Sequence, residues 1–363
     1  MSQRSAGESG VLGQYARSVR HRRSGLVVGT LLLAVASVGS VAMGATSIPI
    51  DRTVSILLAG PGGETVASTI IWQIRLPRVL SAVTIGAGLS LAGVVMQSVL
   101  NNPLGSPYTL GISHGAMFGA AVSIVVLGAG TLTLGGGAEL SFSNPYLVTI
   151  VAFLAALSSA GVILALATYR GASPETMILT GIALSSLYTA GTTALQYFAS
   201  QNELASIVFW SFGDVGRATW SNVGLLSVVL VGSVAVFLRE SWKYNALDAG
   251  SETARSVGVD VSSVRNRGML VASFLTALGV AFVGIIGFVG LVVPHVVRKL
   301  IGNNKASLLP TAAVVGALLL VVSDTAARTF FAPTVLPVGI VTSFVGAPFF
   351  IYLVIRGKEY WKG

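Results

Sequence analysis

The side chains that could do chemistry in this sequence are few, and the most prominent are three arginines at the edges of uncharged stretches. Arg75 and Arg78 precede the run 79–138, which contains no Asp, Glu, Lys or Arg, and Arg328 closes a second apolar stretch. A guanidinium group at such an edge can anchor a helix end among lipid headgroups, where Asp324 would pair with Arg328. It can equally form a basic rim that receives an acidic partner. Both roles are electrostatic, and neither makes or breaks a bond.

No residue pattern in this sequence indicates catalysis. His114 and His295 lack a nearby carboxylate or a second histidine at ligand spacing, so packed or loop histidines are expected rather than metal ligands. The chain has no cysteine, no H-E-x-x-H, no Ser-His-Asp order and no G-x-x-x-x-G-K-[ST] phosphate loop. We therefore expect a protein that is not an enzyme, binds no metal and has no cofactor of its own.

The elements that must carry these residues are membrane-spanning helices. Of the 363 residues, 53% are hydrophobic and 10% are charged, and the mean hydropathy is +0.82, which excludes an ordinary soluble domain. A helix needs about 20 apolar residues to cross a bilayer, so charge-free windows predict an all-α, polytopic membrane protein with about ten transmembrane helices, one of them short. The windows are 26–46, 79–100, 109–129, 146–168, 177–198, 221–238, 268–286, 289–300, 307–327 and 337–355.

Two details of this prediction follow from chain length. The run 79–138 is too long for one crossing, and the segment 101–107 supplies a hairpin between the second and third spans. The stretch 268–302 reaches only about 52 Å as a helix, whereas two full crossings need about 60 Å. One helix of that pair is therefore expected to be short, bent near Gly287 and Gly290, and shielded by protein.

The basic residues predict the orientation of the chain. We expect both termini in the cytoplasm, with 1–24 as a cytoplasmic tail before a retained first span and 25–363 as a single transmembrane domain. The formal charge of +9 is then a consequence of topology, and nucleic acid is not an expected partner. With this orientation, the outer segments hold, out of 22 Lys and Arg residues, only Arg52, Arg75, Arg78, Arg217 and Arg328.

The longest predicted inner loop, at about 240–267, is the second candidate site. Residues 248–257 favour a short helix, and Gly258 stands where a C-cap would be. The loop is either a solvated connector or a docking helix for a cytoplasmic partner. A partner is needed if the chain uses ATP, because the chain has no phosphate loop of its own.

Several linked motifs resemble one known family. They are RLPR, GAGLSLAGVVMQSVLNNPLGSPYTLGISHGA, WSFGDVGRATW, GIIGFVGLVVPHVVRKLIG, LLPTAAVVGALLLVVSDTAAR and LPVGIVTSFVGAPFFIYLVIR, in this order between about Trp72 and Arg356. The sequence resembles the permease subunits of the ATP-binding-cassette (ABC) importers for iron-siderophore complexes, haem and cobalamin. The resemblance implies a multi-pass protein of a bacterial or archaeal cytoplasmic membrane. It also implies a second permease copy or a paralogue, two cytoplasmic ATPase subunits that bind ATP and Mg²⁺, and an external substrate-binding protein.

The resemblance also implies roles for particular residues. Arg75, Arg78 and Arg328 match arginines that meet glutamates of the binding protein. Candidate pathway or gate positions are Gln97, Asn102, Pro103 and Ser173, for which polar helix packing is the alternative. The inner loop resembles the segment that contacts the ATPases, although Ala249-Gly250 replaces the usual Leu-Gly and Ser251-Glu252 the frequent Glu-Glu. Its candidate coupling residues are Ala246, Asp248, Gly250, Glu252, Ala254 and Gly258.

We therefore expect the permease subunit of an ATP-driven importer, with a ferric siderophore as cargo. Haem and cobalamin stay open, because the matching motifs belong to the shared transport apparatus. A self-contained secondary transporter is the alternative from a different class. It would usually need a buried ionisable relay, which the spans do not suggest. A membrane-embedded enzyme is the third and weakest possibility.

Overall fold

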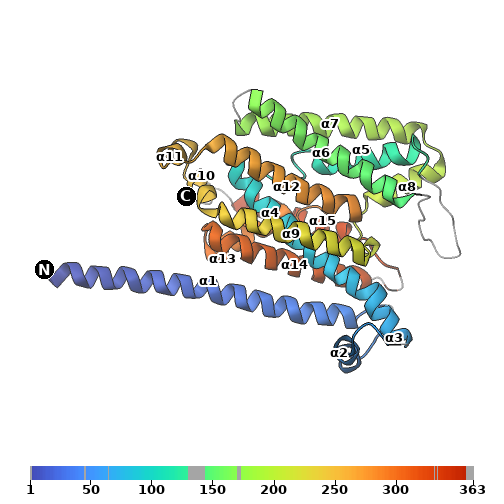
Figure 1. Cartoon of the computed structure of the whole chain (residues 1–363), viewed down its shortest axis with the longest axis horizontal. Coiled ribbons are helices and arrows are strands. Elements are labelled where there is room, and N and C mark those ends of the chain that lie inside the picture. Colours follow the sequence, from blue (N-terminus) through green and yellow to red (C-terminus); the bar gives the residue numbers. More distant parts are fainter. Residues whose placement is uncertain are drawn as a thin grey trace.

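The computed structural model describes residues 2–44, 46–63, 65–129, 144–169, 173–330, 332 and 334–356, with side chains from Arg22 onward except at 353, 354 and 356. These residues are almost entirely helical, and one isolated β-bridge joins Phe212 to Ile285. The helices of Figure 1 are α1 (Ser2–Ala42), α2 (Ile50–Ala59), α3 (Val66–Thr69), η1 (Ile70–Arg75), α4 (Leu76–Val99), α5 (Ile112–Val125), α6 (Pro145–Tyr169), α7 (Pro174–Phe198), α8 (Gln201–Ser211), η2 (Val215–Arg217), α9 (Trp220–Arg239), α10 (Ser241–Asp248), α11 (Ser251–Ser256), α12 (Val261–Val283), α13 (Val289–Ile301), α14 (Lys305–Thr329) and α15 (Val338–Arg356).

The prediction of an all-α, polytopic membrane protein is confirmed. Within the described ranges, seven helical segments are long and apolar enough to cross a membrane, and the shorter helices α5, α13 and α15 occupy the other three predicted windows. The seven segments are Arg22–Ala42, Val66–Val99, Pro145–Tyr169, Pro174–Phe198, Trp220–Arg239, Val261–Val283 and Lys305–Thr329.

Some predicted boundaries were wrong. The window 109–129 contains only the 14 residues of α5, about 21 Å of helix, because Gly111 at its start and Gly128 after its end both have positive φ. The predicted helix 248–257 is shorter in the structure, where α11 covers Ser251–Ser256. Ala249 and Gly250, with φ +107° at Gly250, separate α11 from α10, which ends at Asp248. Gly258, with φ +82°, ends α11 as predicted.

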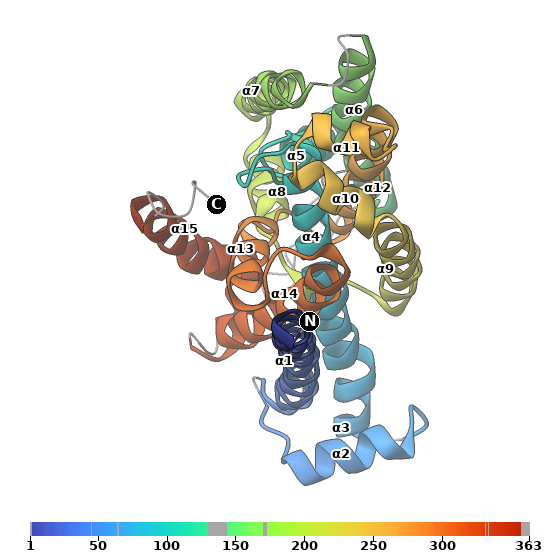
Figure 2. The same cartoon turned by 90° about the vertical axis from the view of Figure 1, so that its left-hand side faces the viewer.

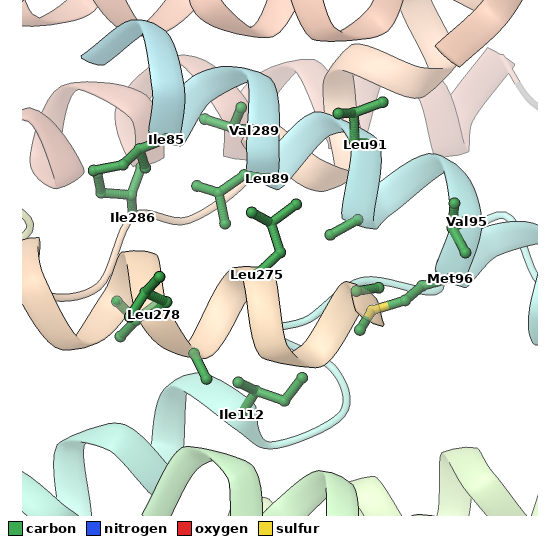
Figure 3. Packing of buried hydrophobic residues seen from close by; sticks show 14 of the residues in the cluster. Ile85, Leu89, Leu91, Val95, Met96, Ile112, Leu275, Leu278, Ile286 and Val289 are labelled. Atoms are coloured by element: carbon green, nitrogen blue, oxygen red, sulfur yellow. The ribbon is translucent and has the colours of Figure 1, made fainter. Parts of the chain in front are cut away.

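Helix α4 is the centre of the bundle, with α9, α12, α13 and α14 around it (Figure 2). A Cβ atom on Gly86 would overlap the carbonyl of Gly316 in α14, and one on Gly93 would overlap the carbonyl of Gly290 in α13. The helices therefore approach each other closely at these small residues. Figure 3 shows Leu275 of α12 beside Leu89 of α4 in the apolar core.

A π-helical turn, Ile70–Arg75, precedes α4. Pro77 has no N–H, and its ring would clash with the carbonyl four residues earlier in an ordinary α-helix. The backbone adopts one wider turn instead, in which the N–H of Leu76 donates to the carbonyl of Ile71. This turn ends just before Arg78 and so sets the direction in which the first arginines of the motif point.

The bundle has two ends that are distinguished by their residues (Figure 1). Helices α2 and α3 lie at one end, which we call the arginine end because it contains Arg75, Arg78 and Arg328. Helices α10 and α11 lie at the opposite end, together with the start of α1, and we call this the loop end. The predicted tail 1–24 falls within α1, and the side chains before Arg22 lie outside the described residues.

Candidate functional site

A buried carboxylate organises the arginine end. Asp324 of α14 is 1% exposed and accepts a 2.8 Å hydrogen bond from Nη2 of Arg78 and a 3.0 Å bond from Nε of Arg328. Asp214, in the segment before η2, adds a 3.2 Å contact to Nη2 of Arg78. The ion pairs therefore join α4, α14 and the segment 212–217.

Two of the arginines also hold the end of α1. Nη1 of Arg75 donates to the carbonyls of Val41 and Ala42 at 2.8 and 2.7 Å, and Nη1 of Arg328 donates to the carbonyl of Met43 at 2.9 Å. The last carbonyls of a helix have no partner within the helix and carry its negative dipole end, so cations stabilise them. These arginines cap α1 from other helices.

The predicted arginines thus gather at one end, but not as an open rim. Arg75 and Arg328 are 5% and 8% exposed, and the side chain of Arg78 is 14% exposed. The predicted i,i+4 pair of Asp324 with Arg328 is confirmed. Docking of a binding protein stays a prediction, and such a partner would have to approach guanidinium groups that already have acceptors.

A second charged cluster lies at the loop end. Lys305 begins α14, is 1% exposed, and donates from Nζ to the carboxylate of Asp248 and, at 2.8 Å, to Oδ1 of Asn303. Its backbone N–H donates to Oδ1 of Asn245 at 2.9 Å. Helix α10, which carries the candidate coupling residue Asp248, is therefore fixed to the turn between α13 and α14.

Hydrogen bonds continue from this cluster to the hairpin after α4. Nδ2 of Asn303 donates to Asp248 at 2.7 Å, and Arg298 donates to Oδ1 of Asn303 at 3.0 Å and to Oε1 of Gln97 at 2.8 Å. The backbone carbonyl of Gln97 accepts the N–H of Asn102 at 3.0 Å. We call these five residues, Asp248, Asn303, Arg298, Gln97 and Asn102, the relay. It joins a predicted coupling residue to two predicted gate residues.

The hairpin itself is held by its own polar groups. Oδ1 of Asn102 accepts the N–H of Leu104 at 2.9 Å, on the far side of Pro103, and Asn101 has φ +43°. Ser173, the other predicted gate residue, is the N-cap of α7, where its hydroxyl accepts the N–H of Thr176 at 3.2 Å. Ser173 has a clear capping role and is not part of the relay.

The remaining predicted coupling residues divide into an outer and an inner set. Glu252 is exposed on α11, whereas Ala254 is fully buried and Ala246 is half-buried. Asp260 caps the start of α12. Hydrogen bonds from the N–H of Ser263 and the hydroxyl of Ser262 lower the pKa of its carboxyl. The exposed face of α11 is accessible to a partner.

A cavity of about 700 Å³ lies between α15 and the central helices. Its lining is apolar or hydroxylic, and Lys, Arg, Asp, Glu and His are absent from the described residues that form it. Phe288, in its wall, has φ +66°, a strained conformation for an aromatic residue. None of the predicted gate residues lines the cavity. No sequence pattern marked the side-chain hydroxyl groups of the lining, which belong to Ser106, Tyr108, Thr109, Ser113, Ser211, Thr276 and Ser343.

Comparison with known proteins decides the family. The FecCD transport family model matches residues 32–356. The chain belongs to this family. An ABC transporter permease of Methanocaldococcus jannaschii is 48% identical over 334 residues, 91% of this chain and 95% of its own. The hemin transport permease HmuU of Yersinia pestis is 35% identical over 342 residues, 92% of this chain and 96% of its own. A solved structure, described as an inward-facing metal-chelate type ABC transporter, has a TM-score of 0.78 and 31% identity, covering 91% of this chain and 98% of that one.

Membership of the FecCD family makes this chain a multi-pass permease of the ABC importer type. The resemblance seen in the sequence motifs is thereby confirmed. Other relatives, named for import of cobalamin, Fe(3+)-citrate and molybdate, match 88% or more of this chain. The family therefore defines the transport apparatus and leaves the cargo to be inferred from this chain's own residues.

Proposed function

We propose that this FecCD permease imports a ferric siderophore and that separate ATPase subunits supply the energy. The uncharged cavity between α15 and the central helices carries this proposal. A siderophore surrounds its metal with organic groups, so the complex presents a bulky surface of carbon, hydroxyl and amide groups. A cavity of about 700 Å³ with apolar and hydroxyl walls suits such a surface.

The same cavity argues against a small oxyanion such as molybdate. An anion transferred from water into an apolar site needs cations or several donors to replace its hydration, and the described lining offers only hydroxyl groups. Haem or cobalamin remains the alternative within the class, because each is also a large organic metal chelate. Haem carries two carboxylates that this lining would not neutralise.

The relay supports a permease driven by a partner at the loop end. In the proposed orientation the loop end is cytoplasmic, and α11 offers an exposed face to an ATPase subunit. Movement of α10 would act on Asn303 and Arg298 and, through them, on Gln97 and the hairpin. Nε2 of Gln97 is buried and has no partner among the described residues, so it is available to a different arrangement of the hairpin.

Two further surfaces, the exposed side of α7 and α15 and the arginine end, are available to the other partners. Large apolar side chains are exposed on α7 and α15, among them Leu187, Phe198 and Phe344, and Phe344 also lines the cavity. A second permease copy or a paralogue on this side would close the cavity into a pathway. The arginine end, external in this orientation, would receive the substrate-binding protein.

The test is uptake of a radiolabelled ferric siderophore by cells that lack this subunit and by cells complemented with it. Unlabelled haem and cobalamin are added as competitors in parallel. We expect complementation to restore uptake and neither competitor to reduce it. Equal uptake with and without the subunit, or full competition by haem or cobalamin, would overturn the siderophore assignment.

A further inference from the structure

A second, smaller pocket lies at the junction of α9 and α10. It has a volume of about 380 Å³ and is lined by Val236, Arg239, Glu240, Trp242, Lys243 and Arg267. It shares no residue with the large cavity, and α9 lies on the side of the bundle opposite α15 (Figure 2). The pocket is therefore separate from the transport pathway proposed above.

The pocket has more positive than negative charge. Glu240 is 3% exposed, and its carboxylate accepts from Nζ of Lys243 at 3.3 Å and from the guanidinium of Arg267. This single carboxylate offsets one of three cations. The side chain of Arg239 has no acceptor among the residues that the structure describes. The lining therefore carries a net charge of +2, which favours the binding of an anion.

The surroundings of the pocket indicate where that anion comes from. Trp242 is 53% exposed, and tryptophan in such a position favours the headgroup layer of a membrane. On α9, exposed apolar side chains form a stripe that leads to the pocket, at Leu225, Val228, Val231 and Leu238. A cationic pocket at the end of an apolar stripe matches a phospholipid, whose phosphate and acyl chains are joined in one molecule.

We propose that this pocket binds the phosphate headgroup of an acidic phospholipid, with its acyl chains along the exposed stripe of α9. Arg239 supplies a forked donor to the phosphate, and Lys243 supplies a second positive charge. Glu240 precedes the first residue of α10, so a bound lipid would hold the junction through which α9 continues into the loop end. The proposal depends on the membrane location of the chain and not on its cargo.

Titration of the purified full-length permease in a neutral detergent tests this, with bound lipid counted by native mass spectrometry. The ligands are phosphatidylglycerol, phosphatidylcholine and inorganic phosphate. We expect phosphatidylglycerol to bind more tightly than phosphatidylcholine, and Arg239→Gln to weaken its binding about five-fold, as loss of one interfacial charge predicts. Arg255→Gln, which removes an exposed cation from α11 at the same end, should leave binding unchanged.

Three outcomes would overturn the proposal. Equal binding of the acidic and the zwitterionic lipid would show that the pocket does not select a lipid by the charge of its headgroup. Inorganic phosphate that binds as tightly as the lipid would identify a free anion as the ligand. Unchanged lipid binding by Arg239→Gln would show that the lipid binds elsewhere on the permease. Because Arg239 has no intramolecular acceptor among the described residues, its replacement should not disturb folding, and a thermal unfolding curve checks this.

Discussion

Arg78 and Asp324 are 246 residues apart in the sequence and form a buried ion pair, with Nη2 and Oδ1 2.8 Å apart. Arg328 donates to the other oxygen of the same carboxylate at 3.0 Å. One anion between two guanidinium groups is favourable where each group alone would be costly to bury. The start of α4 and the end of α14 are therefore fixed to each other at the arginine end.

Asp324→Asn should destabilise the permease strongly. The change leaves two buried arginines without their shared anion, and breaking a buried pair in this way costs about 3–5 kcal/mol. Asp214→Asn is the matched control, because Asp214 is 31% exposed and contacts Arg78 at 3.2 Å. It should cost about 1 kcal/mol or less. Thermal unfolding in detergent measures both, and equal losses would contradict the central position of Asp324.

Gly93→Ala should also destabilise the bundle. Its methyl group would overlap the carbonyl of Gly290, so α4 and α13 would have to separate, at about 1–3 kcal/mol. Gly224→Ala in α9 is the control, because a Cβ there meets no atom within 4 Å. Alanine favours a helix over glycine, so this control should be neutral or slightly stabilising. A neutral Gly93→Ala would mean that the α4–α13 contact is looser than described.

Arg298→Gln should separate ATP hydrolysis from transport. The shorter neutral side chain cannot bridge Asn303 and Gln97, so movement of α10 would no longer reach the hairpin. We expect the assembled importer to keep its ATPase rate and to carry several-fold less substrate per ATP. Arg52→Gln, an exposed position on α2 at the other end, is the charge-matched control. An unchanged ratio of cargo to ATP would remove the relay from the mechanism.

Ser343→Trp should block transport without unfolding the chain. Ser343 lines the large cavity from α15, and an indole there would occupy volume that the cargo needs. Val35→Trp adds the same group on α1, at a position that is 71% exposed and outside the lining. Uptake should fall at least ten-fold in the first variant and stay near normal in the second, with similar protein in the membrane. Similar uptake by both would place the pathway elsewhere.

Most of the fold can be predicted from the sequence, because each membrane span can be recognised from its own uncharged stretch of about 20 residues. The prediction fails for α5, whose length depends on Gly111 and Gly128 adopting positive φ. It also missed α8, although Ser200 and Glu203 form a capping box that sequence inspection could have found.

The site is predicted less completely, because its contacts join distant parts of the chain. The family motifs include Arg75, Arg78 and Arg328. Residue spacing does not locate their acceptors, which are Asp214 and the backbone carbonyls at the end of α1. The cations of the relay and of the cluster beside it cannot be recognised from the sequence for another reason. Arg298 and Lys305 have the same pattern as ordinary inner-side charges, and the hydroxyls of the cavity resemble any polar residue inside a span.

Transport by the reconstituted importer tests ATP-driven import by this permease. The permease, its ATPase subunits and the substrate-binding protein are placed in proteoliposomes, and accumulation of labelled ferric siderophore is followed with ATP or with a proton gradient alone. We expect accumulation with ATP, none with a non-hydrolysable analogue, and none with the gradient alone. Accumulation driven by the gradient, in liposomes that hold only this chain, would instead identify a secondary transporter.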